Sequence, residues 1–103
     1  MNIQGLMQQA QRMQKKMIEI ETEFKKEIFE TEAGGGAVKV TMNGNMEVVK
    51  IDVSPDVKSE DIETITDLLI AAVNQSITTV RKAKEARLSK IIGKAGSTIP
   101  GLF

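Results

Sequence analysis

The sequence contains no cysteine and no histidine, which removes several kinds of chemistry at once. Disulfide bonds, thiolate or imidazole metal sites and the usual nucleophile–base pairs all need one of these two residue types. Tryptophan and tyrosine are also absent and phenylalanine occurs only three times, so an aromatic platform for stacking unpaired bases is not expected. These absences predict a protein that is not an enzyme and that uses no metal or organic cofactor.

Long apolar runs are missing as well. Polar residues interrupt the N-terminal segment before the core of a signal peptide or a membrane helix can develop. We therefore expect a cytoplasmic protein that does not contact a membrane. The 103 residues, of which 41% are hydrophobic and 27% charged, suffice for one folded domain, so we assign residues 1–103 to a single domain.

The net charge is zero, but the two signs are unevenly distributed along the chain. Residues 1–26 carry five cations and three anions, and residues 81–103 carry six cations and one anion. Residues 27–80, in contrast, carry three cations and ten anions. Positive charge is therefore concentrated at the two ends of the chain, where it suits a polyanionic partner.

The first element expected is a long helix over about residues 3–26, with Asn2 as its N-cap. Its apolar residues alternate at spacings of three and four, which is typical of a coiled-coil seam. The members of this heptad seam are Ile3, Leu6, Ala10, Met13, Met17, Ile20 and Phe24.

Three strands should follow this helix and form an antiparallel meander. A short strand at residues 29–33 leads through three glycines to a hairpin whose two strands flank Asn43-Gly44. A two-residue turn would place Val38 opposite Val49 and Val40 opposite Glu47. The side chains that would then share the core face are Val38, Val40, Val49, Ile51 and Val53.

A second long helix is expected from a cap at Ser59, with Glu60, Asp61 and Glu63 in its first turn, to Ile92, before a terminating Gly93. Its buried stripe should comprise Ile62, Ile65, Leu69, Ala72, Val73, Ser76, Ile77 and Val80. At roughly 50 Å, this helix must project beyond a compact domain. Residues 93–103 are expected to be a flexible tail. The fold class is thus α+β, in the order α-β-β-β-α.

The heptad seam predicts a homodimer, because one small sheet cannot cover its full length. The residues expected at the dimer interface are Leu6, Met13, Met17, Ile20 and Phe24. Leaving five such side chains exposed would cost a large part of a stability of only about 5–15 kcal/mol. The alternative is that the seam folds back onto the second helix of the same chain.

Three segments, in their order and spacing, resemble the YbaB/EbfC family of bacterial nucleoid-associated proteins. These are residues 5–17 (GLMQQAQRMQKKM), 36–44 (GAVKVTMNG) and 68–76 (LLIAAVNQS), followed by Pro100-Gly101. The resemblance spans essentially the whole chain, although the tail is shorter than is common in the family. It implies a tweezer-like homodimer with a three-stranded antiparallel sheet and two long helices, which holds DNA with its helical arms in the nucleoid and influences nucleoid organisation and gene expression.

Double-stranded DNA is accordingly the expected partner, bound through its phosphates with little sequence specificity. The residues expected to bind it are Arg12, Lys15, Lys16, Lys25, Lys26, Arg81, Lys82, Lys84, Arg87, Lys90 and Lys94. One alternative is that these cations only keep the helices soluble. Another is a coiled-coil adaptor for a replication or recombination protein, with the acidic middle of the chain as its docking surface.

Overall fold

The computed structural model describes residues 2–96, and the side chains of residues 2–90. The elements are α1 (Ile3–Phe24), β1 (Ile28–Ala33), β2 (Val38–Asn43), β3 (Val48–Val53), the 3-10 helix η1 (Pro55–Ser59) and α2 (Ile62–Gly96). This order confirms the predicted α-β-β-β-α fold. Asn2 caps α1 as expected, since its side chain accepts a hydrogen bond from the Gly5 amide at 3.1 Å.

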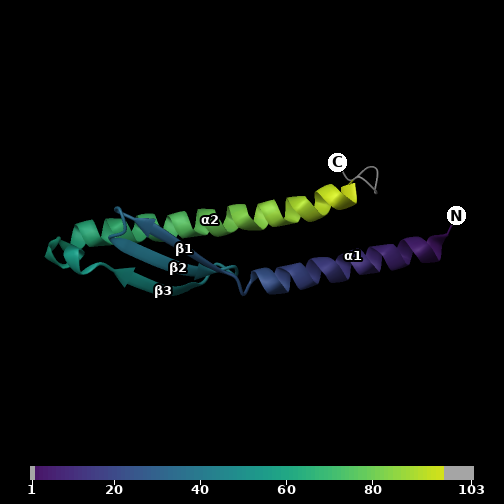
Figure 1. Cartoon of the computed structure of the whole chain (residues 1–103), viewed down its shortest axis with the longest axis horizontal. Helices are drawn as coiled ribbons and strands as arrows, with labels where there is room; N and C mark the ends of the chain where they lie inside the picture. Colours follow the sequence, from purple (N-terminus) through teal and green to yellow (C-terminus); the bar gives the residue numbers. More distant parts are fainter. Residues whose placement is uncertain (1, 97–103) are drawn as a thin grey trace.

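The chain is strongly elongated. Its principal extents are 71 × 22 × 16 Å, and its radius of gyration of 19.9 Å exceeds the ~13 Å of a compact domain of this length. Figure 1 shows the cause: the first half of α2 lies along the sheet, whereas α1 and the second half of α2 extend from the same end of the sheet as two arms. We call these two projections the arms.

The sheet is an antiparallel meander in the order β1-β2-β3, as the sequence predicted. The predicted register of the hairpin is wrong. Val38 lies opposite Val53 and Val40 opposite Ile51, and a bulge falls between Thr41 and Met42. The turn is longer than two residues, so Val38 and Val40 are each paired four positions farther along β3 than predicted.

The chemistry of Asn43 explains the longer turn. Its side-chain oxygen accepts hydrogen bonds from the main-chain amides of Asn45 (2.9 Å) and Glu47 (3.0 Å). The main-chain amide of Asn43 in turn donates to the main-chain carbonyl of Glu47 at 3.0 Å. The left-handed conformation falls on Met46, with φ of 59°. These hydrogen bonds from the Asn43 side chain stabilise the longer turn relative to the tight two-residue Asn-Gly turn.

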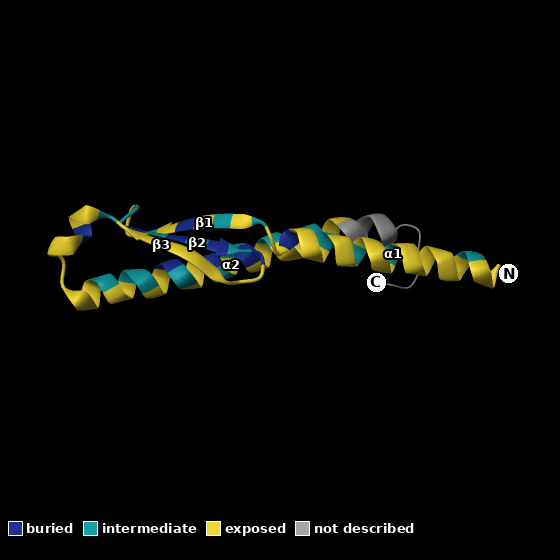
Figure 2. Cartoon of the chain, turned by 90° about the horizontal axis from the view of Figure 1, so that it is seen from below, coloured by how far each residue is buried: buried dark blue, intermediate teal, exposed yellow. Residues whose placement is uncertain are grey.

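Two clusters of buried side chains form the core between α2 and the sheet. Val38 and Val40 of β2 pack on Ala72, while Met42 packs with Phe24 and Val80. Figure 2 shows these buried segments on β2 and on the facing side of α2. A polar pair lies among them, because the hydroxyl of Thr31 on β1 is hydrogen-bonded to that of Ser76, which donates to the Ala72 carbonyl at 2.9 Å.

The predicted limits of the second helix are wrong at both ends. Residues 55–59 form η1, and the cap is Asp61, whose carboxylate accepts from the Thr64 amide at 2.8 Å. At the other end the helix continues beyond Gly93 to Gly96, because a helical glycine costs only about 1 kcal/mol relative to alanine and does not by itself end a helix. Residues 93–96 of the predicted tail are thus helical, and residues 97–103 lie outside the described part of the chain.

The predicted stripe of α2 is buried at its centre but not at its start. Ala72, Ser76 and Val80 are fully buried, whereas Ile62 is 80% exposed. Ile62 is the first residue of the helix, where the chain has only just left η1. The prediction that Ile62 belongs to the core is therefore wrong.

Candidate nucleic-acid interface

The first arm is α1, which is exposed along almost its whole length. Phe24 at its C-terminal end is the one residue of α1 that is buried. Arg12, Lys15 and Lys16 are all exposed and, at spacings of three and four, lie on one side of the helix. Glu19 and Glu23 follow on the same side, so the charge of this arm is mixed.

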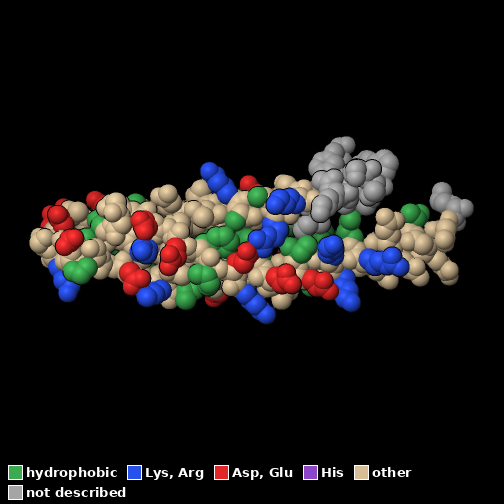
Figure 3. All heavy atoms as spheres, in the orientation of Figure 1, with side chains coloured by type: hydrophobic (Ala, Val, Ile, Leu, Met, Phe, Trp, Pro, Cys, Tyr) green, Lys and Arg blue, Asp and Glu red, His purple; other side chains and the backbone are tan. Residues whose placement is uncertain are grey.

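The second arm is the C-terminal half of α2, and its charge is more uniform. Arg81, Lys82, Lys84 and Lys90 are exposed on it, with Glu85 as the one anion between residues 81 and 96. Figure 3 shows Lys and Arg side chains recurring along both arms, with Asp and Glu side chains among them on the basal half of α1 and over the sheet. The side chain of Lys94 lies outside the described side chains, and Lys25 and Lys26 are exposed in the turn that follows α1.

Arg87 is the exception among the predicted DNA-binding cations. Its guanidinium pairs with both carboxylate oxygens of Glu27, with Nη2 at 2.8 Å from Oε1, and lies 5.1 Å above the centre of the Phe24 ring. The hydrogen bond to Glu27 raises the pKa of Arg87 above its ordinary value. Of the predicted DNA-binding residues with described side chains, Arg87 alone is in an ion pair within residues 2–90.

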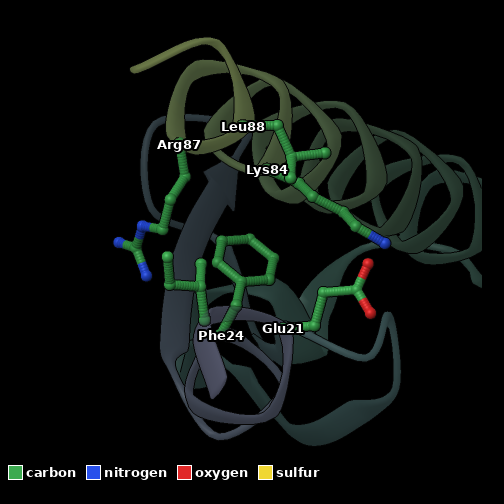
Figure 4. A pocket seen from close by; sticks show the side chains of 6 residues that line it. Glu21, Phe24, Lys84, Arg87 and Leu88 are labelled. Atoms are coloured by element: carbon green, nitrogen blue, oxygen red, sulfur yellow. The ribbon is translucent and has the colours of Figure 1, made fainter. Parts of the chain in front are cut away.

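A shallow crevice marks the base of the two arms. Its lining comes from Ile20, Glu21 and Phe24 of α1 and from Lys84, Arg87 and Leu88 of α2. In Figure 4 the amine of Lys84 points toward the carboxylate of Glu21, and the side chain of Leu88 lies beside Lys84 on α2, across the crevice from Phe24. The two arms therefore meet here within one chain.

The heptad seam has two parts in this structure: its C-terminal end faces α2 of the same chain, and its N-terminal end is exposed. Phe24 is 3% exposed and packs inside its own chain, and Ile20 lines the crevice facing α2. The fold-back alternative thus describes this end of the seam, because α2 is long enough to reach α1. Met13 and Met17 are half-buried, and Leu6, farther along the arm, is 57% exposed.

A second apolar surface lies on the core side of β3. Val48, Ile51 and Val53 pair with the buried residues Met42, Val40 and Val38, yet all three remain more than two-fifths exposed. The reason is that α2 packs on β1 and β2, which leaves the third strand uncovered. We call Val48, Ile51 and Val53 the β3 strip. The sequence prediction placed Val49, Ile51 and Val53 in the core, which is wrong for the single chain, where all three are exposed.

Neither a metal-binding cluster nor a membrane-spanning helix is found among the described residues. Within them, no three His, Cys, Asp or Glu side chains are grouped in a way that would hold a metal ion. Nor is any described helix both long and apolar enough to span a bilayer. The features that stand out are the cationic arms, the Arg87–Glu27 pair and the uncovered β3 strip.

Residues 1–95 match the model of the YbaB/EbfC DNA-binding family. The chain belongs to this family. The membership confirms the resemblance inferred from the sequence, and the family is a DNA-binding family and not an enzyme family.

Relatives of this YbaB/EbfC family member share nearly its full length. A nucleoid-associated protein of Thermoanaerobacter pseudethanolicus is 41% identical over 103 residues, which cover 99% of this chain and 91% of the relative. A nucleoid-associated protein of Legionella pneumophila is 36% identical over 96% of this chain and 87% of its own length. The crystal structure of an uncharacterised protein from Helicobacter pylori superimposes with a TM-score of 0.75 at 25% identity, over 89% of this chain and 98% of that one.

Two features of this family member were missed by sequence reasoning. The Arg87–Glu27 pair joins residues 60 positions apart, and no local pattern indicates such a contact. The β3 strip had a signal, because Val48 and Val49 are adjacent and a strand with one solvated face should alternate. Two apolar neighbours at that point indicate a bulge or a strand covered on both faces.

Proposed function

We propose that this protein is a nucleoid-associated protein that binds duplex DNA as a homodimer, through phosphate contacts with little sequence preference. The observation that carries the proposal is the pair of projecting arms with exposed cations, in a member of a DNA-binding family. The exposed Lys and Arg side chains can each approach a phosphate without breaking an ion pair within residues 2–90.

Phosphate contact is favoured over base readout by the residue types. Arginine reads bases through paired hydrogen bonds, whereas the more frequent cation on the arms is lysine, which acts as a point charge. Binding of this kind releases counterions, so affinity should fall with salt at a log–log slope near −0.9 for each phosphate contacted.

The homodimer is supported by the apolar side chains that one chain leaves uncovered. They include Leu6 at the far end of the seam and the β3 strip. Completing the burial of an aliphatic side chain is worth on the order of 1 kcal/mol, so a second copy covering both surfaces would gain several kcal/mol per chain. Dimerisation would also double the number of cations presented to one duplex.

The test is a fluorescence-anisotropy titration of two duplexes of unrelated sequence at a series of salt concentrations. We expect both duplexes to bind with similar affinity and with the same negative dependence on salt. Absence of binding to either duplex at about 50 mM salt, where phosphate contacts are strong, would overturn the proposal. A strong preference for one duplex would overturn the claim of low specificity.

A second candidate function, a docking module for a replication or recombination protein, is favoured by one observation. Ile62 is 80% exposed at the end of the molecule remote from the arms, between Asp61 and Glu63. Such a partner would be retained in affinity purification after nuclease treatment, and the Ile62→Ser variant would lose it. If nuclease removes all co-purifying proteins, this candidate is rejected.

A further inference from the structure

The orientation of α1 is set at one end only. Among the described residues, no strand packs along α1 and α2 makes no extensive contact with it. Figure 2 shows α1 exposed over most of its length, from the N-terminus to the base of the arms. Whatever fixes the angle of this arm must therefore lie at its C-terminal junction.

The junction is built from Phe24 and Glu27 and from the residues that meet them. The Phe24 ring packs between Met42 and Val80 and lies 5.6 Å from the Phe29 ring. The main chain at Glu27 accepts a hydrogen bond from the Gly44 amide at 3.0 Å. These contacts tie the end of α1 to the sheet.

Arg87 ties the same junction to the other arm. Its guanidinium binds the Glu27 carboxylate through two nitrogens and covers the Phe24 ring. An arginine held by two parallel hydrogen bonds and one ring face has little rotational freedom, unlike a lysine paired at one point. Within residues 2–90 it is the ion pair that bridges the α1 junction and α2.

We propose that Arg87 is a positioning residue that holds the two arms at a fixed opening, and that it does not contact DNA phosphate. A phosphate contact would require Arg87 to leave Glu27, whereas Lys84 and Lys90, three positions away on either side, are already exposed. The consequence for DNA binding rests on the proposed function: the opening sets the spacing of the cations on the two arms. The role of Arg87 in fixing the opening of the arms does not depend on DNA binding.

The absence of cysteine makes the opening directly measurable. Spin labels on Gln8→Cys and Ser89→Cys, both exposed, report the distance between the arms by double electron–electron resonance. Mixing the labelled chain with excess unlabelled chain removes distances between labels on different subunits. We expect one narrow distance in the native sequence and a broader or longer distribution in Glu27→Gln and in Arg87→Met. The exchange variant Glu27→Arg with Arg87→Glu should restore the narrow distance.

DNA binding supplies the second measurement, with a matched control. Glu27→Gln and Glu19→Gln both remove one exposed or half-exposed anion, so simple charge repulsion predicts tighter binding in both. We expect Glu19→Gln to bind equally well or better, and Glu27→Gln to bind roughly threefold more weakly, a loss in the range of a partly exposed ion pair.

The possible results distinguish failure of the positioning role of Arg87 from failure of the proposed DNA-binding function. An unchanged distance distribution in both Glu27→Gln and Arg87→Met overturns the positioning role, whether or not DNA binds. Equal tightening of DNA binding by Glu27→Gln and Glu19→Gln overturns it as well and leaves the proposed function intact. A native protein that binds no duplex but widens its arms in Glu27→Gln would overturn the proposed function and retain the positioning role.

Discussion

Val40 and Ile51 are direct cross-strand partners on the same face of the sheet, yet Val40 is completely buried and Ile51 is 43% exposed. The difference arises because α2 covers β1 and β2 and stops short of β3. An apolar row that is half covered is the kind of surface that a second protein chain completes. The β3 strip therefore leads to the first prediction.

Ile51→Lys should convert the protein from a dimer to a monomer at micromolar concentration, because it places a charge in the surface that a second copy would bury. Ile28→Lys is the matched control, since Ile28 is 58% exposed on the same sheet and points to the opposite face. Analytical ultracentrifugation distinguishes the two. A dimer that survives Ile51→Lys, or dissociates equally in Ile28→Lys, contradicts the assignment of the β3 strip to the interface.

The buried hydroxyl pair should show strong non-additivity. Ser76→Ala removes the hydroxyl partner of Thr31 and leaves it only the Ala72 carbonyl at 3.4 Å, so we expect a loss of about 1–3 kcal/mol in the free energy of unfolding. Thr31→Val should cost less, because Ser76 still donates to Ala72.

Adding Thr31→Val to Ser76→Ala should then restore part of the lost stability, since both hydroxyls are gone. Urea denaturation of the four proteins completes the cycle. Simple additivity of the two single losses would show that the hydroxyls do not depend on each other.

Gly44 is required for a close approach between two main-chain segments. A Cβ atom at this position would lie 1.8 Å from the carbonyl oxygen of Phe24, far inside van der Waals contact. Gly44→Ala should therefore destabilise the fold by more than about 3 kcal/mol, beyond the usual cost of an overpacked site. Gly35→Ala is the control without a clash: a Cβ atom at Gly35 would meet no other atom within 4 Å, so only the left-handed φ of 65° opposes alanine there, at a cost of about 1–2 kcal/mol. Thermal unfolding of both variants checks the difference.

The cap of α2 should contribute a pH-dependent part of the stability. Hydrogen bonds from Thr64 hold the pKa of Asp61 below its usual value. The stabilisation is therefore fully present above the ordinary pKa of aspartate, about 4, and is lost as the pH falls through the lowered value. Asp61→Asn keeps a capping side chain that does not titrate.

The stability of the native protein relative to Asp61→Asn should accordingly shrink as the solution is acidified below about pH 4. Urea denaturation at a series of pH values measures this difference. A difference that stays constant between neutral and acid pH would show that Asp61 does not act through its charge.

The order of elements was predictable because each signal was local. The seam of α1, its cap at Asn2 and the alternation in β2 are patterns of residues within a few positions of one another. The register of β3 was not predictable, because it depends on hydrogen bonds that the Asn43 side chain makes across its own turn.

The candidate site was predictable only as a set of exposed cations. Most of the predicted positions needed no tertiary information, since Lys and Arg on a polar helix face are exposed in most folds. Arg87 has sequence neighbours similar to those of Lys84 and Lys90. The fold, however, brings it into contact with Glu27 and Phe24, which lie about 60 residues away in the sequence. Its separate role follows from the long-range contact and not from its type.

The DNA-binding proposal depends most on whether the arms, and not the sheet, carry the phosphate contacts. The direct measurement is the salt dependence of duplex binding for Arg81→Ala, Lys82→Ala and Lys84→Ala combined. The control is Lys39→Ala, Lys50→Ala and Lys58→Ala combined, which removes the same charge from the sheet half. We expect the log–log slope to become shallower by about 0.9 for each phosphate that the arm variant no longer binds, and to stay unchanged in the control. An unchanged slope in the arm variant, or an equal change in both proteins, would contradict the assignment of DNA binding to the arms.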